Sequence, residues 1–362
     1  VGFGGFLWGS AGITVPWEMY AQWADTTVLQ EHYPAMRKYI DYVFLNYIDK
    51  SSGIIVQERQ WGDLGDWLSP VYGQDDKSLI WETFLIHDLD IMAETARVLG
   101  RLEEASRYSR LAEDRRSFFC RTYLRPGTGK TIASAFMGNR QGQLVDTQTS
   151  YVMPLAFEVV RGGLRDSLIV NLLTVMEREN KMDDGKTAPP WSLLTGFIGT
   201  GWINRALSES GQSGAAYRLL LQRSYPSWLY PVTQGATTIW ERLNSYTLED
   251  GFGGNNRMNS FNHYSFGAVG YWMISHSLGI RRDERQPGFR HFFLAPEPDM
   301  SGSITYARGH YDSIFGRIES GWEKHPDKMV YRFSIPEGTS ATLLLMGERP
   351  QELKAGHYEF VR

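Results

Sequence analysis

The spacing of apolar residues changes once along this chain, and that change constrains its fold more than any other feature. Up to about residue 280, apolar side chains recur every three or four positions, which places them on one face of a helix. One such stripe runs through Leu29, Tyr33, Met36, Ile40, Val43 and Tyr47. After Gly288 the spacing falls to two, as in Met329, Tyr331, Phe333 and Ile335, which is typical of strands. We therefore expect a helical domain over residues 1–285 and a small antiparallel β-sandwich over residues 286–362.

The predicted helices follow one another in pairs. A second stripe runs from Trp81 to Leu99 and ends at Gly100, a residue type that is favoured just after a helix. Further helical patterns cover 102–123, 147–161, 166–179, 192–208, 213–222 and 260–279, and longer loops cover 51–77 and 223–257. Helical hairpins whose loops gather at one end are typical of an α/α toroid, a mainly α architecture.

Composition excludes several classes of function. The net charge of −4 and the absence of a basic block argue against nucleic-acid or anionic-membrane partners, and no apolar run reaches membrane-spanning length. The single cysteine, Cys120, cannot form an intrachain disulfide, and we expect it to be a small buried hydrophobe. The eight histidines are scattered, so we expect neither a metal nor a cofactor. The chain opens at Val1 inside what looks like a domain, so we expect a piece of a longer bacterial protein. The sequence does not decide between a cytoplasmic and a periplasmic location, and a homodimer is one open alternative.

One segment imitates a phosphate-binding loop. Pro126-Gly127-Thr128-Gly129-Lys130-Thr131 resembles the end of that motif, but the motif needs glycine five residues before Gly129, where this chain has Leu124. The segment also follows a predicted helix, whereas the motif follows a strand. We therefore interpret it as a surface loop.

Two loops place carboxylates beside tryptophan. The first contains Trp61-Gly62-Asp63-Leu64-Gly65-Asp66-Trp67, and the second contains Trp240-Glu241-Arg242 and is followed by His263. An aromatic face can stack on the C–H bonds of a sugar ring while a carboxylate moves a proton. Glycoside hydrolysis uses two carboxylates on one sugar, so the two loops together predict a sugar-cleaving site. Structural roles stay open, including an ion pair in which Arg242 orients Glu241.

Several ordered blocks make the chain similar to a known family over nearly its whole length. They are Val15-Pro16-Trp17, Gly65-Asp66-Trp67-Leu68, Thr147-Gln148-Thr149-Ser150-Tyr151, Thr195-Gly196-Phe197-Ile198-Gly199-Thr200, Tyr225-Pro226-Ser227-Trp228-Leu229-Tyr230, Gly235-Ala236-Thr237-Thr238-Ile239-Trp240-Glu241-Arg242, Met258-Asn259-Ser260-Phe261-Asn262-His263-Tyr264 and Pro287-Gly288-Phe289-Arg290-His291. With them the chain resembles bacterial α-L-rhamnosidases of glycoside hydrolase family 78. The resemblance implies an (α/α)6 barrel, incomplete at its N-terminus, and inverting hydrolysis of terminal α-L-rhamnosides in rhamnose-containing glycosides or oligosaccharides.

The resemblance also implies roles for particular residues. The family's glutamate in the Trp-Glu-Arg block is the general base, so it assigns that role to Glu241. It places His263 against the sugar, puts Asp66 and Trp67 near the pocket mouth, and makes Trp240 a reasonable stacking wall. The candidate substrate-binding residues are Asp66, Trp67, Trp240, His263, Trp61, Asp63 and Arg242.

Two departures keep alternatives open. The family's general acid belongs to an upstream motif that this sequence lacks, and Ser10 stands where the family usually has aspartate. A catalytically incomplete carbohydrate-binding barrel is therefore a second interpretation. A third is an α/α-toroid glycosidase for another sugar, because a fold alone does not determine a substrate.

Overall fold

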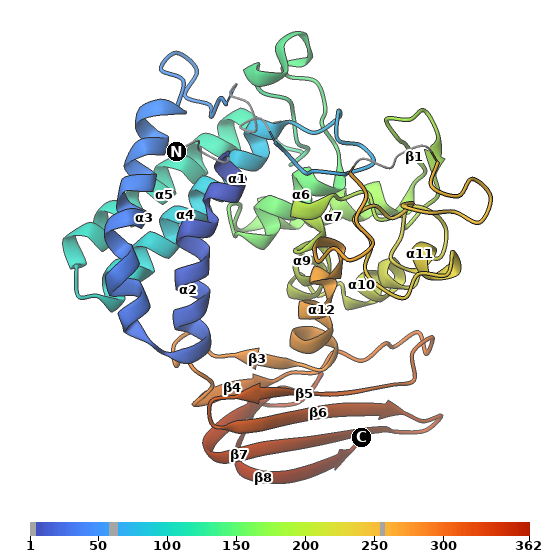
Figure 1. Ribbon diagram of the computed structural model, residues 1–362. Helices are drawn as coiled ribbons and strands as arrows, with labels where there is room; N and C mark the ends of the chain where they lie inside the picture. The colour runs from blue at the N-terminus through green and yellow to red at the C-terminus, as the bar shows by residue number, and fades with distance from the viewer. Residues whose placement is uncertain (1–4, 58–63, 254–257) are drawn as a thin grey trace.

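The chain forms a helical unit that rests on a C-terminal β-sheet (Figure 1). The computed structural model describes residues 5–57, 64–253 and 258–362. Its helices are α1 (Phe6–Gly9), α2 (Ala11–Trp23), α3 (Thr26–Asn46), α4 (Lys77–Val98), α5 (Leu102–Tyr123), η1 (Ala135–Arg140), α6 (Gln148–Ala156), α7 (Gly163–Glu177), α8 (Phe197–Thr200), α9 (Ile203–Glu209), α10 (Ser213–Leu220), α11 (Leu229–Thr233), η2 (Ser265–Ala268), α12 (Val269–Trp272) and η3 (Met273–Ser277). Neighbouring helices pack as the pairs α2/α3, α4/α5, α6/α7 and α9/α10. The change of spacing in the sequence thus corresponds to a real change from helices to strands.

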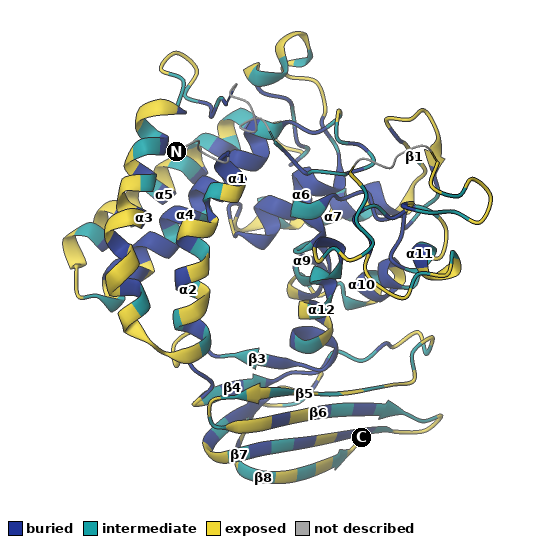
Figure 2. Cartoon of the chain, in the orientation of Figure 1, coloured by how far each residue is buried: buried dark blue, intermediate teal, exposed yellow. Residues whose placement is uncertain are grey.

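Helix α4 is buried on most sides and contacts α1, α2, α3, α5 and α6 (Figure 2). Its first turn is capped by Asp76, whose side chain accepts hydrogen bonds from the amides of Ser78 and Leu79. Its end follows the expectation for Gly100, which has φ +73°. The amide of Arg101 then bonds the carbonyl of Ala96 at 2.8 Å, as in a Schellman motif.

Some helices differ from the sequence-based expectation in length. Residues 192–196 are not helical, and the pattern over 192–208 becomes helical only at α8 and α9. Residues 260–264 likewise precede η2 without forming helix. Helix α2 was not predicted, because Val15, Met19 and Trp23 on its exposed side remove the contrast between an apolar and a polar face.

The C-terminal strands form one connected sheet. They are β3 (Ile280–Arg282), β4 (His291–Leu294), β5 (Tyr306–Ser313), β6 (Gly316–Lys324), β7 (Met329–Leu343) and β8 (Gln351–Val361), in the order β3-β4-β7-β6-β5 with β8 also on β7. All pairs are antiparallel except β4 with β7, which is parallel. A C-terminal β-domain is therefore present as expected, but it forms a single mixed sheet where an antiparallel β-sandwich was predicted, and β3 already belongs to it ahead of residue 286. A separate pair, β1 (Asn180–Lys181) and β2 (Thr187–Ala188), lies within the helical unit.

The sheet and the helices share one hydrophobic core. The indole of Trp322 donates to the carbonyl of Ser277 at 2.8 Å, and the hydroxyl of Ser320 donates to the carbonyl of Leu278 at 2.5 Å. Gly309 allows this close approach, because a β-carbon there would lie 2.6 Å from the Leu278 side chain. The two units are therefore packed against each other through strands β5 and β6.

None of the helices in the described ranges is long and apolar enough to cross a bilayer. Cys120 on α5 is free and half-buried, and burial raises the pKa of its thiol. A thiol in this state is poorly reactive, in keeping with the packing role expected from the sequence.

Candidate active site

The two blocks that carry Glu241 and His263 run side by side. The amide of Glu241 donates to the carbonyl of Ser260 at 2.8 Å, and the amide of His263 donates to the carbonyl of Ile239 at 2.8 Å. The hydroxyl of Thr238 also bonds the carbonyl of Phe261. The two blocks are therefore antiparallel neighbours, and the predicted carboxylate and histidine lie on adjacent segments.

Glu241 is held by one carboxylate oxygen. The amide of Ser260 donates to its Oε2 at 2.7 Å, and the residue is 8% exposed. Within the described ranges, Oε1 accepts no hydrogen bond from the protein, and it is not among the fully buried unpaired atoms. The side chain is thus fixed in direction, with one oxygen left to accept a proton from a water molecule.

His263 lies between two aromatic rings. Its imidazole stacks on Phe197 with the centroids 4.8 Å apart and an interplanar angle of 25°, and Tyr264 stacks on it at 5.3 Å and 12°. The amide of Ser265 donates to Nδ1 at 3.3 Å. When the ring is neutral its proton is therefore on Nε2, which makes Nε2 a hydrogen-bond donor for a ligand hydroxyl.

Asp66 lies deeper than the sequence suggests. It is fully buried, and its oxygens accept from the amides of Gly196 and Ile198 at 2.7 Å each and of Gly199 at 2.9 Å. The hydroxyl of Thr149 donates to it as well. Burial raises the pKa of this carboxyl, and the same hydrogen bonds oppose the rise. The expectation that Asp66 contacts substrate at a pocket mouth is corrected here, because all its oxygen contacts lie inside the protein.

The role of Asp66 is to position α8. This short helix begins at Phe197, the residue under the His263 ring. Gly196 allows the approach, because a β-carbon there would lie 2.2 Å from the Trp67 carbonyl oxygen. Phe197 was not among the predicted site residues, although it lies in the Thr195–Thr200 block and the two glycines around it mark a tightly packed turn.

Trp67 and Trp240 differ in exposure. Trp67 is half-buried, its carbonyl accepts from the amide of Phe197 at 2.8 Å, and its ring meets Tyr72 edge-on. Trp240 is only 7% exposed and packs edge-on against Phe261 at 5.3 Å. Trp67 therefore keeps a face that a sugar can reach, whereas Trp240 supports the segment of Glu241 from within. The expectation of Trp240 as a stacking wall is not met, because its neighbours cover most of the ring.

Arg242 does not pair with Glu241. In the part of the chain that the structure describes, its Nε donates to the carbonyl of Met258 at 3.1 Å and no ion pair joins it to the carboxylate. Its side chain lines a cavity of about 370 Å³ together with Tyr225 and Asn259. The alternative that the sequence left open, an ion pair in which Arg242 orients Glu241, is therefore absent from the described structure.

Trp61 and Asp63, the remaining candidates, lie outside the described residues. Among the residues that are described, no three His, Cys, Asp or Glu side chains gather as metal ligands would. Ser10 is buried, and its hydroxyl donates to Asp88 Oδ2 at 2.6 Å. Ser10 therefore contacts the carboxylate of Asp88, which is buried within the helical core.

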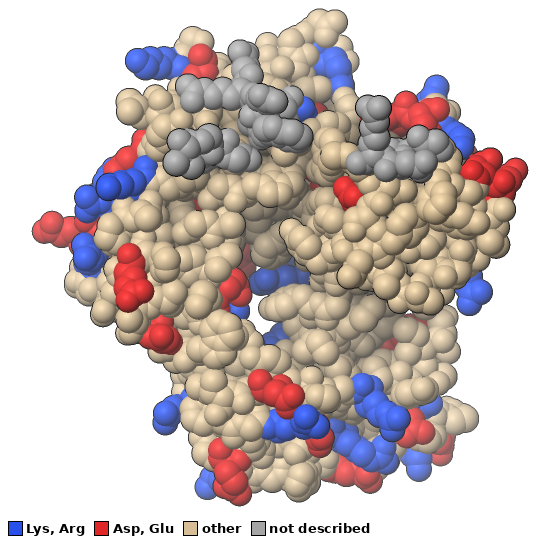
Figure 3. All heavy atoms as spheres, in the orientation of Figure 1, with Lys and Arg blue, Asp and Glu red and all other residues tan. Residues whose placement is uncertain are grey.

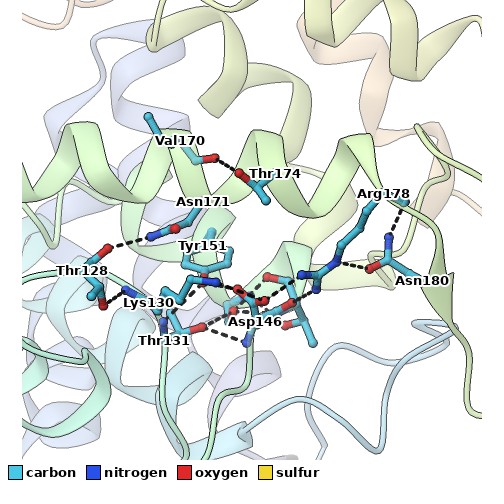
Figure 4. Close-up of polar contacts among 12 residues, drawn as sticks. Thr128, Lys130, Thr131, Asp146, Tyr151, Val170, Asn171, Thr174, Arg178 and Asn180 are labelled. Atoms are coloured by element: carbon cyan, nitrogen blue, oxygen red, sulfur yellow. Dashed lines mark hydrogen bonds and ion pairs between the residues drawn. The ribbon is translucent and has the colours of Figure 1, made fainter.

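The segment that imitates a phosphate-binding loop is a turn after α5, as expected (Figure 4). Leu124 and Thr131 bridge its two arms. Lys130 points to Asp146, with 3.8 Å between Nζ and Oδ2, and Arg178 binds the same oxygen at 2.9 Å. The lysine that would bind a phosphate is thus committed to an ion pair.

Comparison with known proteins gives matches over almost the whole chain. Residues 2–276 match the model of the bacterial alpha-L-rhamnosidase 6 hairpin glycosidase domain, and residues 279–360 match that of the bacterial alpha-L-rhamnosidase C-terminal domain. An alpha-L-rhamnosidase of Streptomyces avermitilis is 33% identical over 355 residues, which cover 98% of this chain and 31% of the relative. One from Formosa agariphila is 30% identical over 359 residues, covering 98% and 35%.

The chain is also similar to solved structures of alpha-L-rhamnosidases. The structure of the Streptomyces avermitilis alpha-L-rhamnosidase complexed with L-rhamnose has a TM-score of 0.84 and 30% identity, covering 100% of this chain and 33% of that one. The native Aspergillus terreus enzyme has a TM-score of 0.81 and 27% identity, covering 98% and 39%. The chain spans about a third of the length of the curated relatives that it matches.

Proposed function

Because this chain belongs to the bacterial α-L-rhamnosidase family, we propose that it supplies the general base for inverting hydrolysis of terminal α-L-rhamnosides, with Glu241 as that base. One observation carries the proposal. Glu241 is anchored through Oε2 on the Ser260 amide, while Oε1 has no hydrogen bond from any described residue. A base needs this combination of a fixed direction and a free acceptor.

The chemistry assigned to Glu241 is the removal of a proton from water. As the water oxygen bonds to the anomeric carbon, one water proton passes to Oε1, and the glycosidic C–O bond breaks on the opposite side. The leaving oxygen needs a proton from a general acid, and we assign no described residue of this chain to that role. Hydrolysis is therefore proposed for the natural polypeptide that carries this chain.

His263 and Trp67 are proposed to bind the sugar. Nε2 of His263 would donate to a sugar hydroxyl, since its ring is held by Phe197 and the Ser265 amide. Trp67 would offer an apolar face to the ring carbons, which is the usual way in which aromatic side chains contact sugars.

The test is hydrolysis of an aryl α-L-rhamnoside by the natural polypeptide and its variants. Glu241→Ala and Glu241→Gln should each lower kcat by about 10²–10⁴-fold, because general-base assistance is lost. The control is Glu249→Ala, an exposed glutamate of the same loop, which should retain activity. The anomer formed first, followed by proton NMR, should be inverted.

Three results would contradict the proposal in different ways. Parental activity in Glu241→Ala would remove the residue from catalysis. A retained anomer would exclude inversion. Quenching of tryptophan fluorescence by L-rhamnose without turnover of any rhamnoside would favour the carbohydrate-binding barrel instead.

A further inference from the structure

The C-terminal sheet has a large groove on the face turned away from the helices. The cavity measures about 1070 Å³ and crosses strands β5, β6, β7 and β8. The opposite face of the same strands carries the buried side chains of Ile318, Trp322, Phe333 and Ile335, which pack in the common core. The groove is therefore separate from Glu241 and belongs to the sheet alone.

Strand register places the groove residues in rows across the four strands. One row is Arg308, Gly321, Arg332 and Glu359, and the next is His310, Glu319, Ser334 and His357. Tyr306 and Glu323 pair at one end. Four strands at the usual spacing give a row about 14 Å long, which a short oligosaccharide can span. Gly321 contributes no side chain, so it leaves a gap between the two arginines.

Several of these side chains are exposed and uncommitted. Arg308, Glu319 and His357 make no hydrogen bond or ion pair with any residue in the described ranges. Tyr306 is 62% exposed. Arg332 is in contrast paired, at 2.8 Å from Glu359 and 3.5 Å from Glu323. The groove therefore combines a paired arginine at its centre with free polar groups around it.

The arrangement of charge favours a neutral, hydroxyl-rich ligand. Two arginines, two histidines and three glutamates are mixed over the groove, and Figure 3 shows acidic and basic side chains interspersed over the sheet. A polyanion would meet the glutamates, and a polycation would meet the arginines. A sugar hydroxyl both donates and accepts, so a chain of sugars can satisfy both kinds of group, while Tyr306 offers a ring to stack on.

We propose that this groove binds a neutral polysaccharide chain. The site is independent of Glu241 and of the proposed hydrolysis. Guanidinium and carboxylate groups form strong, directional hydrogen bonds with neighbouring hydroxyls, and the free side chains Arg308 and Glu319 are placed to make them. The sheet would then hold a glycan while the helical unit acts elsewhere on it.

The test is affinity electrophoresis of the 362-residue chain in gels that contain galactomannan, arabinan or xylan, with polygalacturonate as the anionic comparison. At least one neutral polysaccharide should retard the chain. Arg308→Ala and Tyr306→Ala should each weaken that binding by roughly tenfold or more, whereas Tyr306→Phe should keep it. Arg349→Ala, an exposed arginine of the same domain outside the groove, is the matched control.

Each other outcome overturns the proposal. No retardation by any neutral polysaccharide would exclude the ligand class, and retardation by polygalacturonate alone would indicate an anionic one. Binding that survives in Arg308→Ala and Tyr306→Ala would place the site elsewhere. Self-association that Arg308→Ala abolishes in sedimentation would identify the groove as an interface between copies. Glu241→Ala should leave retardation unchanged, which separates this result from the test of hydrolysis.

Discussion

The two residues that carry the proposed chemistry are oriented by main-chain amides. Ser260 donates its amide to Glu241, and Ser265 donates its amide to His263. The free atoms, Oε1 and Nε2, follow from these two contacts. A sequence cannot show them, because an amide is present at every position and only the path of the chain selects which one is used.

At the residue scale, His276 should make stability depend on pH. It is 2% exposed on η3, and its Nδ1 lies 2.8 Å from the Ser275 hydroxyl. Burial, together with the smaller effect of the charges of Arg281 and Arg205, lowers its pKa to about 3. An unfolded histidine has a pKa near 6.5, so below about pH 6.5 the unfolded chain binds a proton that the folded chain does not. Stability contributed by the neutral ring is therefore lost as pH falls from about 6.5 towards 3.

The measurement compares urea unfolding of the parent and His276→Asn between pH 7 and pH 5. Asparagine keeps a polar atom near Ser275 but does not titrate. The parent should lose up to about 1.4 kcal/mol per pH unit more than the variant. Other titrating groups are common to both proteins and cancel in the difference. Parallel curves would show that His276 has no such effect.

At the scale of elements, α8 depends on a single carboxylate. Asp66 accepts from three amides at the start of this helix and from Thr149. In Asp66→Asn one acceptor oxygen becomes a donor that faces other donors. The variant should lose about 1–3 kcal/mol of unfolding free energy in urea. Asp114→Asn, at an exposed position of α5, should change stability little.

The same variant tests the path from Asp66 to the site. Since α8 begins at Phe197 and Phe197 supports His263, aryl-rhamnoside hydrolysis by the natural polypeptide should show a higher KM at a temperature where circular dichroism shows the variant to be folded. An unchanged KM together with lost stability would limit Asp66 to a purely structural role.

The helices and the site differ in how far the sequence predicts them. Amphipathic stripes predicted α3 and α5 nearly to their ends, because burial on one side dictates the spacing. Helix α4 was predicted only from Trp81, although it begins at Lys77 and is buried on most sides. Leu193 and Leu194 fit a helical pattern, but the chain there is not helical and Gly196 closely approaches the Trp67 carbonyl. Asp66 and Glu241 both lie beside a tryptophan in the sequence. The sequence therefore could not show that Asp66 is fully buried while Glu241 keeps one carboxylate oxygen free. Alternation likewise predicts strands without their direction, which is why the parallel β4–β7 pair was missed.

At the scale of the whole molecule, the helices and the sheet should unfold together. Trp322 on β6 is 2% exposed and donates to the Ser277 carbonyl at the end of η3. Trp322→Phe keeps an aromatic ring but leaves that carbonyl without its partner. In calorimetry the variant should show one transition, with the unfolding free energy lowered by roughly 1–3 kcal/mol.

Two separate calorimetric transitions, of which Trp322→Phe shifts only one, would contradict this prediction. Phe293→Leu, a half-buried aromatic on β4, is the comparison variant, since Phe293 makes no contact of this kind with the helical unit in the described structure. It should shift the transition less than Trp322→Phe.

The shared core also bears on how such proteins recombine. The two family models meet between residues 276 and 279, yet this is where Ser277 and Leu278 accept from Trp322 and Ser320. A gene crossover at that border would pair each unit with a unit from another protein, whose surface does not match its own. We therefore expect the helical unit and the sheet to be exchanged together in recombination, although two separate family models describe them.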